Sequence, residues 1–152
     1  LWILVKVLSF GIVSELYGIL KLENQKEIAD IFGVSHQDLI SYLMILSNYR
    51  NLCAHEDIVF EHRTEKGILN TPYHERLGIP RMDDEYIYGK NDIFALILIL
   101  KHLLSQDDFK MMMNEINYEI DKLSGKLKTI NIDAILKKMG FPANYREITY
   151  LE

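Results

Sequence analysis

The sequence has 152 residues, a hydrophobic fraction of 49% and a net charge of −5 at pH 7. We expect a single domain over residues 1–152, because this length supports one core without disulfide or metal staples. The acidic balance argues against a broad nucleic-acid binder, although it leaves room for a small, locally basic site. The single cysteine, Cys53, excludes an internal disulfide framework and fits a cytoplasmic, reducing environment.

The chain opens on an apolar segment, and we predict its first helix over residues 1–20. Gly11 and Gly18 favour close packing of this helix against a neighbour. Polar residues interrupt the segment before it reaches the length of a membrane span, and no signal-peptide pattern precedes it, so we expect no membrane association. Because the chain begins with Leu1 rather than Met, we expect an upstream N-terminal half to be missing.

The next two helices are predicted over residues 24–32 and from Ser35 to about Asn51. Asn24 and Glu27 have the spacing of a capping box at the start of the first helix, and Ser35 caps the second. The pair also resembles a helix-turn-helix, which would indicate DNA binding. The second helix begins without basic residues and continues apolar, so we expect no DNA partner.

The second of these helices ends on RNLCAH, which brings Arg50, Asn51 and His55 close together in the sequence. A histidine can accept and return a proton near pH 7, and a guanidinium can hold a phosphate through two parallel hydrogen bonds. Asn51 shares a helix face with His55 and can orient the imidazole. These groups suit metal-free cleavage of RNA through its 2′-hydroxyl, a route closed to DNA. Five residues leave Arg50 and His55 about 140° apart on a straight helix, so they converge only if the helix ends or bends between them, or if the long Arg50 side chain reaches back.

Two ordinary roles compete with this chemistry. An arginine and a histidine near a helix end can cap the last carbonyl groups and compensate the helix dipole. Cys53 could act as a nucleophile beside His55, but residues this close in sequence rarely form such a pair. We therefore favour a small, half-buried core role for Cys53.

Residues 56–91 are poorly periodic, and we predict a long loop with short elements. His62 and Arg63 are candidate RNA contacts, and other basic residues of the loop alternate with tyrosines that could stack on bases: His74, Arg76, Arg81, Tyr73, Tyr86 and Tyr88. The alternative is an ordinary loop packed through its tyrosines. His55, Asp57 and His62 match no standard zinc spacing, and no Gly-rich phosphate loop is present, so we predict neither a metal site nor a cofactor.

The remaining sequence predicts helices over residues 93–104, 105–123 and 132–139, with Gly140 and Pro142 ending the last. Their expected caps are Asn91 or Asp92, Ser105 and Asn131. No strand pattern of useful length is present. The predicted fold class is therefore all-α: a bundle of four longer helices plus short ones, with one long loop after the motif helix.

RNLCAH resembles the R-x4-H signature of the HEPN superfamily of RNases, in which a polar residue often follows the arginine. The resemblance is closer to the Abi-like abortive-infection proteins of that superfamily. It includes the pattern RN-x-CAH, the segment LWILVKVLSFG at residues 1–11, Ser14-Glu15-Leu16-Tyr17, and the later Gly140-Phe141-Pro142. The similarity spans most of the chain and corresponds to the C-terminal half of a typical family member.

This resemblance implies a HEPN-like helical bundle and a metal-independent endoribonuclease that acts in phage defence as a homodimer, with two R-x4-H motifs facing each other. His55 would be the acid and base, Arg50 would bind the scissile phosphate, and Asn51 would orient them. Many family members carry a basic residue where this chain has Ile58, and Arg63 is a possible substitute. The alternative function is a non-catalytic HEPN-like module that binds RNA or protein.

Overall fold

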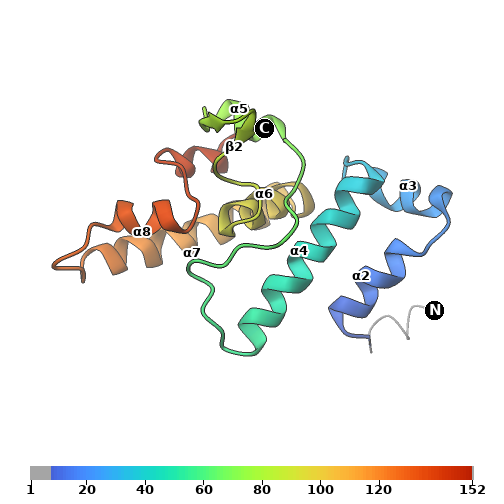
Figure 1. Cartoon of the computed structure of the whole chain (residues 1–152), viewed down its shortest axis with the longest axis horizontal. Helices are drawn as coiled ribbons and strands as arrows, with labels where there is room; N and C mark the ends of the chain where they lie inside the picture. Colours follow the sequence, from blue (N-terminus) through green and yellow to red (C-terminus); the bar gives the residue numbers. More distant parts are fainter. Residues whose placement is uncertain (1–7, 152) are drawn as a thin grey trace.

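The computed structural model describes residues 8–151 and is mostly helical (Figure 1). Its elements in chain order are α2 (Phe10–Gly18), α3 (Leu22–Ile31), α4 (His36–Ala54), α5 (Pro72–Arg76), β1 (Arg81–Met82), β2 (Glu85–Tyr86), α6 (Ile93–Leu103), α7 (Gln106–Ser124), α8 (Ile132–Lys138) and the 3₁₀ helix η1 (Tyr145–Thr149). The two short strands form one antiparallel pair, with Arg81 opposite Tyr86. The predicted all-α class is confirmed.

The first described helix, α2, is shorter than the predicted helix over residues 1–20, of which residues 1–7 lie outside the described residues. Ser9 is its N-cap: the backbone there is extended, and the Ser9 Oγ accepts the N–H of Ile12 at 3.4 Å. A serine at this position satisfies one of the free N–H groups of the first turn. This cap sets the start of α2 at Phe10, and the helix ends at Gly18.

α3 begins at Leu22, so the capping box predicted from Asn24 and Glu27 is wrong, and both residues lie inside the helix. The buried Gln25 explains the early start. Its Nε2 donates to two carbonyl oxygens at the end of α2, at 3.0 and 2.9 Å, and the Tyr17 hydroxyl donates to the Gln25 carbonyl at 2.8 Å. These bonds satisfy the last carbonyl groups of α2 and hold Gln25 within the first turn of α3.

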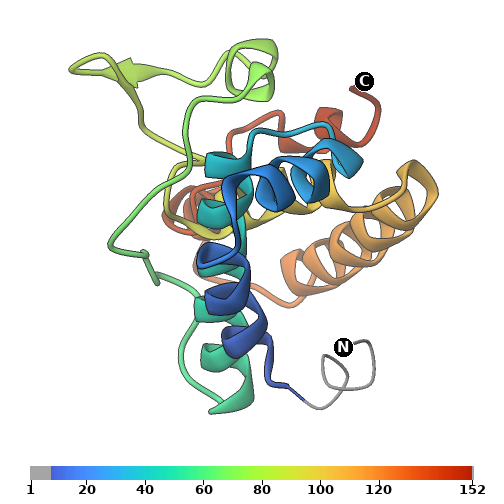
Figure 2. The same cartoon turned by 90° about the vertical axis from the view of Figure 1, so that its right-hand side faces the viewer.

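α4 lies beside α2, as both views show (Figures 1 and 2). Ser35 caps α4 as predicted, because its Oγ accepts the N–H of Asp38 at 3.0 Å. A Cβ added to Gly11 of α2 would lie 3.2 Å from the Ser47 Oγ, so this glycine permits the close approach of the two helices. Gly18 has no such neighbour within 4 Å, and the packing role predicted for it is not seen. α4 turns four residues into the core: Leu39, Tyr42, Ile45 and Tyr49.

α6 is the most buried helix, and it contacts both α4 and α7. Asp92 is its N-cap, and the Oδ1 atom of this buried carboxylate accepts the N–H of Ala95 at 2.9 Å. Gly140 follows α8 with φ 88° and packs directly against Asp92. α7 and α8 begin at the predicted caps, Ser105 and Asn131. Within residues 8–151 no helix combines the length and the apolar character needed to cross a bilayer.

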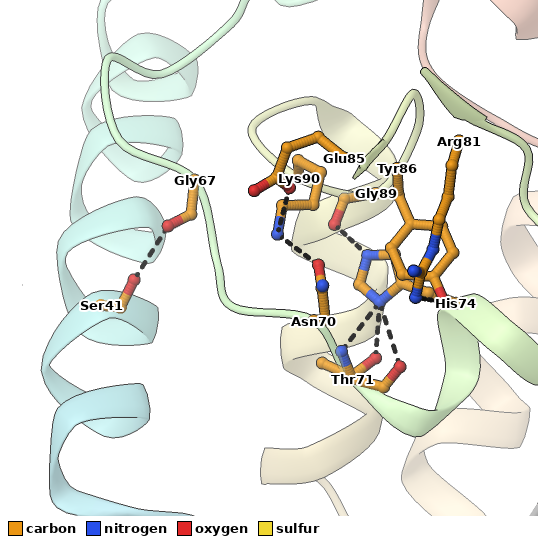
Figure 3. Close-up of polar contacts among 10 residues, drawn as sticks. All are labelled: Ser41, Gly67, Asn70, Thr71, His74, Arg81, Glu85, Tyr86, Gly89 and Lys90. Carbon is orange, nitrogen blue, oxygen red and sulfur yellow. Dashed lines mark hydrogen bonds and ion pairs between the residues drawn. The ribbon is translucent and has the colours of Figure 1, made fainter. Parts of the chain in front are cut away.

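Residues 56–91 contain α5 and the hairpin of β1 and β2. The hairpin projects away from the helices (Figure 2). The part before α5 runs back along α4, where the Ser41 hydroxyl donates to the Gly67 carbonyl at 3.4 Å (Figure 3). The segment is therefore ordered by tertiary contacts, despite its lack of periodicity.

Candidate functional site

α4 ends in a motif that satisfies its last carbonyl groups through the backbone. His55 is the C-cap, and Glu56 follows it in the left-handed conformation with φ 56°. The N–H of Asp57 donates to the Leu52 carbonyl at 3.0 Å, and the N–H of Glu56 donates to the Cys53 carbonyl at 3.4 Å. This is the Schellman arrangement, which normally places glycine where Glu56 stands. The helix end consequently needs no arginine or histidine side chain as a cap.

Arg50, Asn51 and His55 are all exposed to solvent. The Arg50 Nη1 donates to the Asn51 Oδ1 at 3.2 Å, which holds the two side chains together. Within residues 8–151 Arg50 has no carboxylate partner, and the His55 ring makes no hydrogen bond. The guanidinium charge and the imidazole nitrogens therefore remain accessible to a ligand.

Within residues 8–151 the Arg50 guanidinium bonds to Asn51 and forms no hydrogen bond with His55. α4 continues unbroken through Ala54, so it neither ends nor bends between the two residues. On such a helix their side chains leave the axis about 140° apart. Asn51 and His55 are four residues apart and share a face, as predicted.

A groove between α2 and α4 reaches the motif at Asn51. It is lined by Gly11, Ser14, Glu15 and Gly18 of α2 and by Ile40, Met44, Ser47, Asn48 and Asn51 of α4. The α4 members recur at spacings of three and four residues, so they form one stripe along the helix. The groove lies on the face of α4 that carries Asn51, one turn before His55.

His62 contacts this same stripe of α4 at Asn48, a residue that the sequence analysis did not identify. The His62 Nε2 and the Asn48 Oδ1 are 2.7 Å apart, and the His62 ring meets the Tyr49 ring edge-on at 5.3 Å. Burial raises the pKa of Tyr49 to about 12, so its hydroxyl stays protonated and donates to the His62 carbonyl at 3.3 Å. The spacing of three residues places Asn48 on the same helix face as Asn51, but nothing in the sequence indicates its contact with His62.

Arg63 holds the same segment against α8. Its Nη2 donates to the carbonyl of Lys138 at 2.7 Å and its Nη1 to the carbonyl of His62 at 3.0 Å. The Lys138 Nζ also forms an ion pair with Glu61 at 2.7 Å. Carbonyl oxygens are neutral, and Arg63 belongs to none of the ion pairs of the described residues, so its positive charge is not cancelled.

In a comparison with known families, the model of the Abi-like protein family matches residues 1–61. Over these residues, which we call the Abi-like segment, the chain is similar to the Abi-like family. The Abi-like segment contains α2, α3, α4 and the motif residues Arg50, Asn51 and His55, and it ends directly before His62. No curated protein and no solved structure matches the chain.

Beyond the Abi-like segment, two of the loop residues offered as RNA contacts are structural. His74 is fully buried; its Nδ1 accepts the N–H of Thr71 at 3.0 Å, and its Nε2 donates to the Gly89 carbonyl at 2.9 Å (Figure 3). Its ring stacks on the buried Tyr86, whose hydroxyl accepts a hydrogen bond from Arg81 at 2.8 Å. The His74 and Tyr86 rings are therefore covered by protein and cannot stack on bases.

The expectation for Cys53 is corrected, because its side chain is exposed rather than half-buried in the core. It follows Arg50 by three residues at the outer surface of the last turn of α4. His55, Asp57 and His62 do not form a cluster, and residues 8–151 contain no group of three or more His, Cys, Asp or Glu side chains that could hold a metal ion.

Proposed function

We propose that the protein is a metal-independent endoribonuclease of the Abi-like HEPN type, which acts in bacterial phage defence by cutting RNA in the cytoplasm. His55 acts as acid and base on the 2′-hydroxyl and the leaving 5′-oxygen. Arg50 binds the scissile phosphate and stabilises the charge that develops on phosphorus. Asn51, bonded to Arg50, orients the guanidinium.

The observation that carries the proposal is that the motif side chains are exposed and are not needed by the helix they end. If Arg50 and His55 were structural caps, their nitrogens would bind the last carbonyl groups of α4. Those groups are bound instead by the N–H groups of His55, Glu56 and Asp57. This backbone capping leaves both side chains for a ligand, which favours the nuclease over a purely structural role.

The divergence of Arg50 and His55 within one chain supports a site composed of two chains. A base and an acid are needed on opposite sides of the phosphorus, and one motif supplies a single histidine. A two-fold axis beside the end of α4 would add a second histidine and a second arginine. The homodimer is thus part of the proposal.

The test is cleavage of end-labelled single-stranded RNA in EDTA. We expect cyclic-phosphate ends from the parent, no cleavage of the 2′-deoxy oligonucleotide, and a rate at least about 100-fold lower for His55→Ala and for Arg50→Ala. His36→Ala, at the opposite end of α4, is the matched control and should cleave at the parental rate. Full cleavage by His55→Ala would refute the assignment. RNA binding without cleavage by the parent would favour the alternative, a non-catalytic module.

A site composed of two chains is tested by mixing the parent with the His55→Ala variant. If one active site needs two histidines, an equimolar mixture after subunit exchange retains about a quarter of the activity of the same total concentration of parent. Independent sites would retain about half. Light scattering of the parent and the variant establishes that both have the same oligomeric state.

A further inference from the structure

A second cleft lies beside the groove between α2 and α4 and shares Met44 and Asn48 with it. It is lined by Met44, Ile45 and Asn48 of α4 and by residues 62–66, and its volume is about 510 Å³. A cleft of this size is within the range of small-molecule sites. The two hollows are therefore neighbours on α4, and His62, which contacts Asn48, lines the cleft alone.

The wall of the cleft opposite α4 is held in place from several directions. The N–H of Thr64 donates to the Asn91 carbonyl at 2.9 Å, and the Asn91 side chain returns a bond to the Thr64 carbonyl at 3.0 Å. Tyr49 binds the backbone of His62, and Arg63 binds that of Lys138, as described above. A wall anchored at consecutive residues 62–64 forms a preformed surface, which reduces the entropy lost when a ligand binds.

The polar groups that face this cleft retain unused hydrogen-bonding capacity. With the Asn48 Oδ1 accepting from the His62 Nε2, the Asn48 amide keeps two N–H donors and the His62 Nδ1 remains an acceptor. Met44 is 46% exposed and adds an apolar surface beside them. A donor and an acceptor next to an apolar surface match the edge and the face of a nucleobase.

The charge of the cleft matches a phosphate. Arg63 and Lys66 are exposed at its rim, and neither belongs to an ion pair within residues 8–151. Glu65 is the single carboxylate among the lining residues. The lining therefore has a net positive charge on a chain whose overall charge is −5.

We propose that this cleft binds one nucleotide of single-stranded RNA that flanks the scissile position. The base contacts Met44, Asn48 and His62, and its phosphate faces Arg63 and Lys66. Asn48 precedes Asn51 by three residues, or about 4.5 Å along α4, so the cleft lies within one helical turn of the motif. Only a single strand presents its base edges in this way. The inference rests on the proposed endoribonuclease and adds the residues that select its substrate.

The experiment is binding of a fluorescent 2′-fluoro RNA oligonucleotide, which lacks the attacking hydroxyl, measured by anisotropy over a range of salt concentrations. Asn48→Ala should weaken binding about tenfold without changing the salt dependence, because it removes a base contact. Lys66→Ala should lower the slope of log affinity against log salt by about 0.7, because it removes a phosphate contact. Lys66→Arg should restore the slope. Lys126→Ala, an exposed lysine after α7, is the charge-matched control and should bind as the parent.

The outcomes separate this inference from the proposed nuclease. If the protein cleaves RNA but Asn48→Ala and Lys66→Ala both keep the parental affinity and salt slope, the RNA-binding role of the cleft is refuted and the nuclease proposal stands. If the variants lose affinity but the protein never cleaves RNA, the RNA-binding role of the cleft is supported and the nuclease proposal is refuted. Circular dichroism of each variant checks that the helices are intact. An oligonucleotide that does not bind the parent at all would overturn the cleft.

Discussion

Replacing Gly140 with alanine tests how the end of α8 is joined to the start of α6. A Cβ at Gly140 would lie 2.2 Å from both the Cγ and the Oδ2 of Asp92, and 2.7 Å from its Cβ. Asp92 is 2% exposed and caps α6, so it has little freedom to move aside. The Gly140 φ of 88° adds a conformational cost for any residue with a side chain.

The expected cost combines two terms. Overpacking in a closed site costs about 1–3 kcal/mol, and the left-handed backbone costs about 1–2 kcal/mol. We expect the free energy of unfolding to fall by about 3 kcal/mol, which for a chain of this size lowers Tm by about 6–12 °C. Urea unfolding at pH 7 and calorimetry measure the two quantities.

Two controls make this prediction sharp. Gly18→Ala places a methyl at a helical position with no atom within 4 Å, so it should leave stability unchanged or raise it by up to about 1 kcal/mol. In an Asp92→Ser background, which keeps a capping oxygen and removes part of the clash, Gly140→Ala should cost at least about 1 kcal/mol less than in the parent. A Gly140→Ala protein within about 0.5 kcal/mol of the parent would refute the packing argument.

Two further changes test the loop and the end of α4. Burial lowers the pKa of both His74 and His102, so the unfolded chain binds more protons below about pH 6.5, and urea midpoints should fall as the pH drops from 7.5 to 5.5. Burial raises the pKa of Asp92, which changes stability with pH in the opposite direction. Urea midpoints that do not fall between pH 7.5 and 5.5 would contradict the dominance of the two histidines. Glu56→Gly should raise the free energy of unfolding by about 1 kcal/mol, because glycine adopts the left-handed C′ position without strain. Equal or lower stability of Glu56→Gly in urea unfolding would show that Glu56 has a compensating contact.

The helices that carry strong local signals were predicted well. Ser35, Ser105 and Asn131 each cap the helix expected of them, because a cap and its free N–H groups lie within three residues. The start of α3 was predicted wrongly, because Gln25 forms its bonds with α2 and this tertiary contact outweighs the capping pattern of Asn24 and Glu27.

Some residues of the candidate site could be predicted from the sequence, and others could not. The exposed triplet Arg50, Asn51 and His55 could be named from the sequence, because its members lie on one helix with known geometry. The contact between His62 and Asn48 spans 14 residues and depends on the path of an aperiodic loop, so no local pattern indicated it. Cys53 was misplaced for a related reason: its exposure follows from which face of α4 packs on the core.

Residues a few positions apart were enough to predict the all-α class, the caps of the longer helices and the motif at the end of α4. The burial of His74 and the cleft that residues 62–66 form beside Asn48 could be seen only in the folded chain. These features depend on contacts between residues far apart in the sequence, and a local sequence pattern does not indicate such contacts.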